Sequence, residues 1–354
     1  MKNKLSERIK NFNITILMSL FLLISCGSGQ QAVDAANGGA AATGEKSLSS
    51  VISSARQLFL DAFVSFGELL KEAFGLTADT TKKAVGERLG KVGDAVKIAK
   101  DKLEELKGNE QFNLIKDKVE STINKAIDTL GKIVEGASKI KDATGSANGK
   151  VGGNVGDTED AAPANTASVK GLVEGFNLIY EAAKEAGTEP KGNANKAIAN
   201  SKEVGNLFNL TANVTDAKAL SGARRAVIAA SGADILAAIE AVKDKDDAAG
   251  NIDVAKNAYD IAIANKSNGN VTHVQTNASA ISAGLALRAM AKGGKLATAA
   301  NHAPKDGINA VLIGVVSKTV NEIISTIRRT VDKCLKDIDD CIKEDSSSVV
   351  KPTN

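Results

Sequence analysis

Three cysteines and two histidines are the residues of this 354-residue chain whose side chains are best suited to chemistry. Cys334 and Cys341 stand seven apart in a helical pattern, so they share a face but lie about 10 Å apart along the axis, too far for a disulfide in a straight helix. We interpret them as buried thiols acting as small hydrophobic side chains. The alternatives are a bridge between two chains, which gives a homodimer, and pairing after helix disruption. His273 and His302 stand alone, whereas zinc needs four clustered ligands, so no metal site is predicted.

The third cysteine, Cys26, follows a segment with the layout of a secretory leader. Four basic residues in the first ten precede an apolar run from Ile14 to Ile24, which is much shorter than the roughly 20 residues of a membrane-spanning helix. The sequence Leu-Ile-Ser-Cys-Gly over residues 23–27 resembles a lipobox, in which the chain is cut before a lipid-modified cysteine. We therefore predict a signal peptide over residues 1–25 and lipid attachment at Cys26. The alternative is an ordinary signal peptide in which Cys26 is incidental.

The lipid on Cys26 predicts how the mature chain is held. One acyl chain binds a membrane only marginally, whereas two or three chains on one cysteine anchor a protein stably. The polar, glycine-containing residues that follow lack large apolar side chains except Val33, so we expect a lipidated flexible tether over residues 26–46.

Motifs of common catalytic sites are missing from the sequence. There is no His-Glu-x-x-His, no Gly-x-Ser-x-Gly and no phosphate-binding loop, since the glycine spacing in residues 86–91 is wrong for one. Scattered carboxylates are typical of solvated helix faces, and the basic doublets at residues 224–225 and 328–329 are typical of surface features or ion pairs. We predict that the chain is not an enzyme and has no catalytic residue, cofactor or small-molecule substrate.

The charge of the mature chain argues against nucleic-acid binding. The leader carries four basic side chains and one acidic side chain, so the net charge of +3 falls to zero when it is removed. The sequence pI near 8.5 thus belongs largely to the leader.

Composition and periodicity predict an all-α fold for residues 47–344. The chain is 43% hydrophobic but only 3% aromatic, which suits closely packed, alanine-rich helices. Apolar residues recur at helical spacing over residues 48–73, 77–108, 112–137 and 308–344. Gly86, Gly90 and Gly93 flank the second stripe and predict close contact with another helix. We expect an elongated helical bundle whose long first and last helices pair near the membrane, followed by a disordered tail over residues 345–354.

Polar, glycine- and asparagine-rich breaks separate shorter helices in the middle of the chain. The break over residues 142–166 has no large apolar side chain beyond Val151 and Val155, so it is expected not to bury itself. Similar breaks follow at 187–195, 243–251 and 265–270. The simplest interpretation of these breaks is ordinary loops between helices.

A small-residue block over residues 278–296 carries a resemblance to a known family. It reads as a tightly enclosed helix stopped by Gly293 and Gly294. Its Leu-Arg-x-Met-Ala-Lys core, Leu287 to Lys292, resembles a block of the Borrelia variable large proteins and VlsE-like lipoproteins, as do residues 92–96, the Phe-rich first helix and the leader. The resemblance spans nearly the whole mature chain.

The resemblance implies a helical lipoprotein on the outer surface of a spirochaete, one of many versions that are exchanged to evade host antibody. Its implied partners are the outer membrane, through lipid on Cys26, and host antibodies. The region of about 142–275 would then hold the variable, antibody-facing loops. Two alternatives stay open: an adhesin or host-factor binder, with a patch at Arg224 and Arg225 or at residues 243–247, and a lipoprotein that faces the periplasm.

Overall fold

The computed structural model describes residues 75–77, 79–107, 116–153, 156–246, 250–266 and 269–348, all within the compact unit Ser47–Asn354. Cys26, the predicted leader and tether, and the predicted helix over residues 48–73 lie outside the described residues. The expected pairing of the first and last helices therefore stays a prediction.

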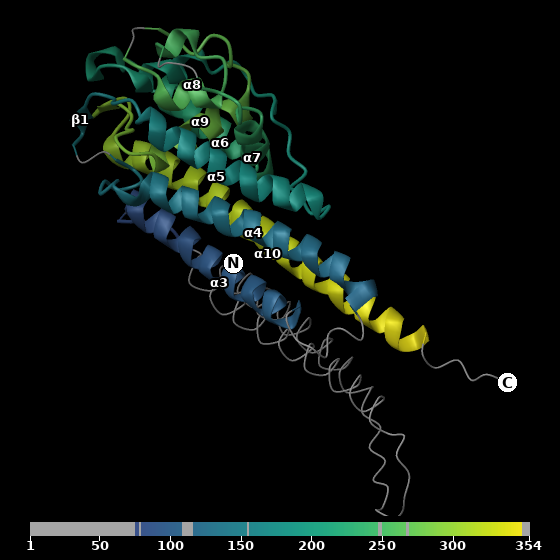
Figure 1. The fold of residues 1–354 in the computed structure, drawn as a ribbon. Helices are drawn as coiled ribbons and strands as arrows, with labels where there is room; N and C mark the ends of the chain where they lie inside the picture. The colour runs from purple at the N-terminus through teal and green to yellow at the C-terminus, as the bar shows by residue number, and fades with distance from the viewer. Residues whose placement is uncertain are drawn as a thin grey trace, which may run out of the picture. The chain divides into compact units, whose positions relative to one another are not determined.

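Three long helices run side by side and form what we call the stem: α3 (Lys82–Lys107), α4 (Lys116–Gly145) and α10 (Lys305–Ser348) (Figure 1). The predicted stripe of α3 is buried from Val85 to Leu106, and that of α4 from Val119 to Ala137. These helices form because their apolar side chains recur every three or four residues and can be buried on one face. The helical class and these stripes, predicted from the sequence, are confirmed.

The three glycines of α3 lie against α4, as predicted. A Cβ atom built at each would fall within 3 Å of a side chain of α4: Thr144 for Gly86, Lys141 for Gly90 and Ala137 for Gly93. Because real Cβ atoms do not approach so closely, these positions let the two backbones pack tightly.

The helix α10 contains a stretch that is long and apolar enough to cross a membrane, judged by length and composition. No other helix in the described residues contains such a stretch. More than half of that stretch is buried inside the protein, and α10 packs on α4, α5, α7 and α9, which is the behaviour of a core helix. The helix continues to Ser348, so the expected boundary between helix and tail at residue 344 lies too early.

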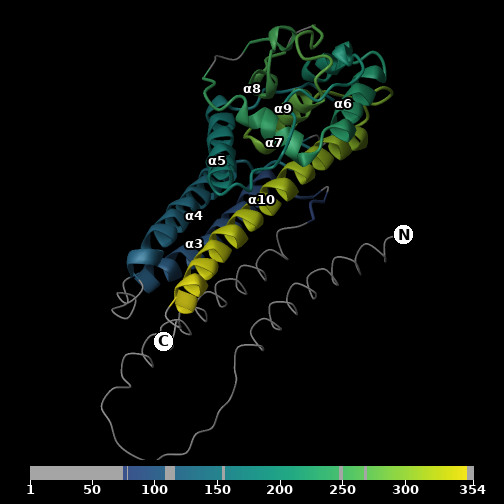
Figure 2. The same ribbon diagram turned by 90° about the vertical axis from the view of Figure 1, so that its right-hand side faces the viewer.

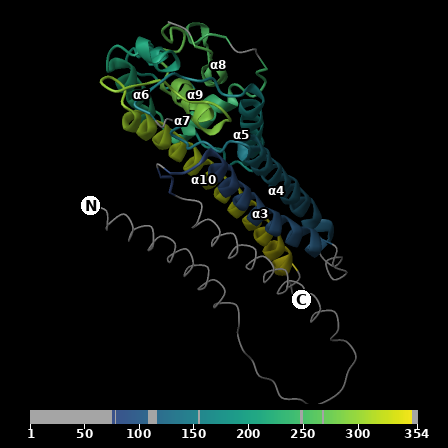
Figure 3. The same cartoon turned by 90° about the vertical axis from the view of Figure 1, so that its left-hand side faces the viewer.

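The described residues between 146 and 304 form what we call the head, which gathers around the first half of α10 (Figure 2, Figure 3). Its helices are α5 (Thr166–Glu185), α6 (Lys218–Ala229), α7 (Gly232–Glu240), α8 (Ala258–Ile263) and α9 (Ala278–Met290), with 3-10 turns at Lys202–Phe208, Thr211–Asn213 and Ile252–Val254. A two-stranded antiparallel sheet joins β1 (Thr158–Glu159) to β2 (Thr298–Ala299), with Thr158 opposite Ala299. The region predicted to hold variable loops thus includes four of these helices.

The polar break over residues 142–166 docks on the protein more closely than its composition predicts. The helix α4 extends to Gly145, and Val151 and Ala161 are almost fully buried. The amide of Val151 donates to the carbonyl of Thr80, and that of Ala161 to the carbonyl of Asn209. A few small buried side chains and paired backbone groups therefore hold this segment on the protein, although most of its described residues stay exposed or partly exposed.

Three asparagines and one serine of the head serve as helix N-caps. Asn165, Asn257 and Asn277 each accept a hydrogen bond from an amide three residues later, at the starts of α5, α8 and α9. Ser231 and Asp234 form a reciprocal capping box at the start of α7. These side chains satisfy amides that a helix leaves unpaired at its first turn.

Candidate functional site

The helix α9 lies at the centre of the head, and every one of its residues is buried. This agrees with the enclosed helix predicted from the small-residue block. Its sequence is apolar or small on all sides except at Arg288, whose side chain is 1% exposed. A charged group in such a place must find hydrogen-bond acceptors inside the protein.

The guanidinium of Arg288 finds those acceptors at the end of a neighbouring helix. Its Nη1 donates to the carbonyls of Ile261, Ala262 and Ala264 at 3.3, 3.1 and 3.1 Å, where α8 ends, and its Nε donates to the carbonyl of Lys295 at 3.2 Å. The free carbonyls of a helix C-terminus carry partial negative charge, which favours a cation. The guanidinium also lies over the ring of Phe208, 4.7 Å from its centroid. Burial lowers the pKa of Arg288 to about 9, so the group stays charged at neutral pH.

A second buried cation, Lys82 in the first turn of α3, meets the end of α9 itself. Its Nζ donates to the carbonyls of Gly294 at 2.6 Å, Ala291 at 2.9 Å and Arg288 at 3.4 Å. Lys82 is 3% exposed. Burial, and to a smaller extent the nearby Arg288 guanidinium, lower the pKa of Lys82 to about 7.

The loop over residues 291–295 connects these two cations to the rest of the head. The amide of Lys292 donates to the Ser168 hydroxyl, which itself donates to the carbonyl of Ala143 at the end of α4. The carbonyl of Lys292 accepts from the amide of Asn165, and Lys295 exchanges two backbone hydrogen bonds with Ala162. We call Lys82, Arg288 and this loop the joint, because they link α3, α4, α5, α8 and α9.

Two glycines allow the loop of the joint to turn this tightly. Gly293 has a φ of +85°, which side-chain-bearing residues rarely adopt. A Cβ on Gly294 would lie 2.2 Å from the carbonyl oxygen of Arg288. The predicted helix stop at these glycines is thus also a close approach of two backbone segments.

The joint is suited to holding the fold together rather than to catalysis. Its acceptors are neutral carbonyls, and it contains no pair of nucleophile and base. Sequence reasoning missed both cations. For Arg288 there was a usable signal, because it is a lone basic residue in an otherwise apolar helix. For Lys82 there was none, because the next residue is also a lysine: Lys83 is half exposed and lies 3.7 Å from Glu87.

The two C-terminal cysteines are thiols that take part in no disulfide, and they lie on the face of α10 that meets α4. Cys334 is buried in the core, as we predicted, and burial raises the pKa of its thiol to about 11. Cys341 is half-buried, and its sulfur accepts from the Thr122 hydroxyl at 3.9 Å. The lipid-attachment residue Cys26 lies outside the described residues.

The remaining candidate residues are dispersed. Among the residues that the structure describes, no three histidine, cysteine or acidic side chains lie close enough to hold a metal ion. Arg224 and Arg225 are exposed on α6. On α10, Arg328 lies 3.7 Å from Asp332, and Arg329 lies 3.1 Å from Glu322.

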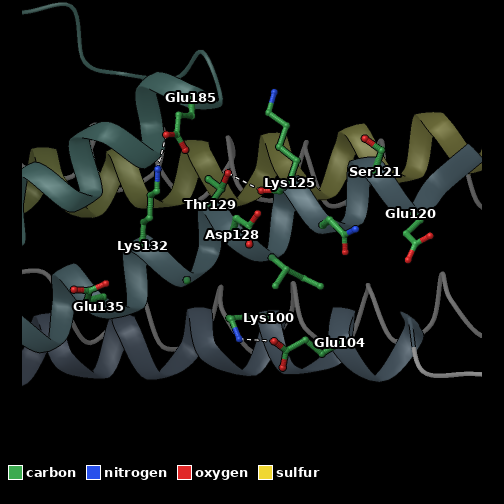
Figure 4. A pocket seen from close by; sticks show the side chains of 13 residues that line it. Lys100, Glu104, Glu120, Ser121, Lys125, Asp128, Thr129, Lys132, Glu135 and Glu185 are labelled. Atoms are coloured by element: carbon green, nitrogen blue, oxygen red, sulfur yellow. Dashed lines mark hydrogen bonds and ion pairs between the residues drawn. The ribbon is translucent and has the colours of Figure 1, made fainter.

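A wide groove of about 1360 Å³ lies along the exposed side of α4, between α3 and the end of α5 (Figure 4). On its walls Lys100 pairs with Glu104, and Lys132 pairs with Glu185. The Thr129 hydroxyl donates to the carbonyl of Lys125. Its lining is largely lysines, carboxylates and small polar side chains, and the groove brings together no set of groups typical of a reactive centre.

Comparison with known proteins identifies the family. Residues 59–342 match the family described as Borrelia lipoprotein. The chain is 34% identical to variable large protein 17 of Borrelia hermsii, over 88% of this chain and 85% of the relative, and 30% identical to variable large protein 25 of the same organism, over 92% and 95%. This chain belongs to the Borrelia lipoprotein family.

A solved structure has the same fold. The Lyme disease variable surface antigen VlsE of Borrelia burgdorferi superimposes with a TM-score of 0.71 and 29% identity, covering 85% of this chain and 99% of VlsE. The resemblance stated from the sequence is therefore confirmed. The family and the fold are those of surface antigens rather than of enzymes.

Proposed function

We propose that this chain is a lipoprotein antigen on the outer surface of the cell, anchored in the outer membrane by lipid on Cys26 and exchanged for other versions to evade host antibody. The observation that carries the proposal is the fold shared with VlsE, which is described as a variable surface antigen. The similarity to variable large proteins supports the same function.

The distribution of burial in the head supports this proposal. All of α9 is enclosed, whereas residues 191–200 include no buried residue, and residues 243–246 are exposed. Substitutions at exposed positions usually change stability by no more than about 0.5 kcal/mol, whereas core positions tolerate few changes. We infer that variation is concentrated in these exposed segments rather than throughout residues 142–275, and that antibodies meet them.

Surface exposure can be tested by adding trypsin to intact cells and following the chain by immunoblot. We expect the chain to be cut at exposed lysines such as Lys191 and Lys196 while a periplasmic control protein is spared. Protection of the chain that persists after mild loosening of its fold would indicate a periplasmic lipoprotein and contradict the proposal.

Lipid attachment can be tested separately with Cys26→Ser. Cells grown with radiolabelled palmitate should label the wild-type chain and leave the variant unlabelled, because the thiol that receives the lipid is gone. The matched control is Cys341→Ser, which removes a cysteine outside the leader and should keep its label. Equal labelling of wild type and Cys26→Ser would show that Cys26 is not the attachment site.

A second candidate function, binding of a host factor, is favoured by one patch on α6. Arg224 and Arg225 are exposed there, and Ile228, one turn further on, is 78% exposed. Arginine beside an exposed apolar side chain is typical of binding surfaces. Cells carrying Arg224→Ser with Arg225→Ser should attach less well to host cells than cells carrying the control pair Lys97→Ser with Lys102→Ser on α3. Equal attachment of the two variants would contradict host-factor binding through this patch and leave antigenic variation as the proposed function.

A further inference from the structure

An asparagine followed by a glycine, Asn148 and Gly149, lies just after the end of α4. Both residues are exposed, and a Cβ built on Gly149 would meet nothing within 4 Å. Of the Asn-Gly pairs in the sequence, this is the one for which the structure describes both residues. The pair is therefore open to solvent, and no other part of the protein crowds the glycine.

The groups of this pair that can react with each other are not held by other partners. Within the described part of the chain, neither the side-chain amide of Asn148 nor the backbone amide of Gly149 takes part in a hydrogen bond. Asn200 differs in both respects. Its side chain accepts from the amide two residues later at 3.1 Å, and the amide of the next residue, Ser201, donates to the carbonyl of Gln275 at 2.9 Å.

An asparagine side chain in this situation can react with the backbone that follows it. The amide nitrogen of Gly149 attacks the side-chain carbonyl carbon, Cγ, of Asn148, and a cyclic imide forms. The proton of the attacking nitrogen passes through the solvent to the departing amine, which leaves as ammonia. Glycine favours this ring closure, because it has no side chain to hinder its nitrogen and its backbone turns freely.

Water then opens the imide by adding its hydroxyl to one of the two ring carbonyl carbons and a proton to the nitrogen. Breaking the bond between the nitrogen and Cγ gives aspartate. Breaking the bond between the nitrogen and the main-chain carbonyl carbon gives isoaspartate, in which the main chain runs through Cγ.

We propose that Asn148 is a site of spontaneous deamidation, at which the chain gains a carboxylate and some molecules gain an isoaspartyl link in the main chain. The carboxyl group of either product is ionised at neutral pH, so the surface of the loop becomes more negative. The reaction consumes only water and releases ammonia, and its products accumulate with the age of the protein.

The isoaspartyl product changes the fold locally, because the same loop holds the start of α3. The amide of Lys82 donates to the carbonyl of Gly149 at 2.9 Å, and that of Lys83 donates to the carbonyl of Ala147 at 3.2 Å. These bonds satisfy amides that the first turn of a helix leaves unpaired. An isoaspartyl link adds one atom to the main chain between the two carbonyls, so we expect it to weaken these bonds. Aspartate leaves the main chain unchanged and should leave both bonds in place.

Tryptic peptides of the full chain measure the reaction. Trypsin cuts after lysine and releases residues 142–150, whose one asparagine is Asn148, and residues 197–202, whose one asparagine is Asn200. The folded chain is incubated at mildly alkaline pH, and samples are digested and analysed by mass spectrometry at successive times. We expect the peptide 142–150 to gain the mass of an acid in place of an amide severalfold faster than the peptide 197–202. An isoaspartyl methyltransferase should then label the aged peptide 142–150.

Two variants separate the chemistry from its effect on the fold. Gly149→Ala keeps the asparagine and should slow the reaction severalfold, because the added Cβ hinders the nitrogen while meeting no other part of the protein. Freshly prepared Asn148→Asp carries the carboxylate without the isoaspartyl link. The amides of Lys82 and Lys83 should keep their protection from hydrogen exchange in this variant and lose part of it in the aged, isoaspartyl-containing chain.

Two results would overturn the proposal. Equal rates for the two peptides in the folded chain would show that the pair at Asn148 is no more reactive than the held side chain of Asn200. Deamidation at Asn148 in urea but not in the folded chain would show that the bonds to α3 hold the loop too firmly for the ring to close.

Discussion

The stem and the head of this protein are held together by different kinds of contact. In the stem, apolar stripes and small residues pack long helices along their length. In the head, the C-terminal ends of three short helices are each capped by a cation from another element: Arg288 caps α8, Lys82 caps α9 and Lys318 of α10 caps α6. The last carbonyls of a helix have no partner within the helix, so where a short helix ends inside the head another element must supply a donor.

The largest expected effect in this comparison comes from Arg288→Met. The change leaves several carbonyls at the end of α8 and in the loop without a donor inside the core, which should lower the free energy of unfolding by about 3–5 kcal/mol. Urea unfolding followed by circular dichroism measures the loss, and failure to accumulate folded protein counts as the upper end of it. Arg225→Met, at an exposed position, removes the same charge and should change stability by no more than about 0.5 kcal/mol. Equal, small effects of both changes would mean that the head does not depend on the joint.

Gly294→Ala tests the tight loop of the joint and is expected to rank second. The added methyl would meet the Arg288 carbonyl at 2.2 Å, and the shift needed to relieve it should cost about 2–3 kcal/mol. Gly149→Ala is the matched control, because a Cβ there meets nothing within 4 Å. Thermal unfolding of the two variants should separate them clearly. A stable Gly294→Ala variant would show that the loop can relax away from α9.

Lys318→Met is expected to have a smaller effect than either change in the joint. Its Nζ donates to the carbonyls of Val227, Ile228 and Ala230, but much of the side chain lies near solvent, and water can replace it. Burial lowers the pKa of Lys318, while Asp234 opposes the shift. Cations at helix C-termini contribute about 0.3–1 kcal/mol, so we expect a loss of that size in urea unfolding. A loss as large as that of Arg288→Met would show that a partly buried cap stabilises the head as much as a fully buried one.

The same comparison explains what the sequence could and could not predict. The stripes of α3, α4 and α10 and the glycine contacts of α3 were predictable, because periodicity in a long helix states directly which face is buried. The enclosed α9 was predictable from its small residues. The contacts of Lys82 and Arg288 were not, because their acceptors are backbone carbonyls, which leave no mark in the sequence. The docking of residues 146–153 and 156–164 was not predictable for the same reason. Backbone groups make its hydrogen bonds, and composition does not show them.

The smallest predicted effect is a difference between the reaction rates of the two cysteines of the stem. It compares a thiol that is buried by packing with one that is partly exposed. The thiolate is the reactive form of cysteine, and burial raises the pKa of Cys334 to about 11, so at pH 8 its thiolate fraction is low and reagents cannot reach it. Cys341, nearly two turns nearer the end of α10, is half-buried and should react first with Ellman's reagent in the folded chain. Reaction of Cys334 should require opening of α10 from α4, so its rate should rise with urea, whereas that of Cys341 should change little. Single variants Cys334→Ser and Cys341→Ser assign each phase, and equal rates in the native protein would mean that the stem is open at Cys334.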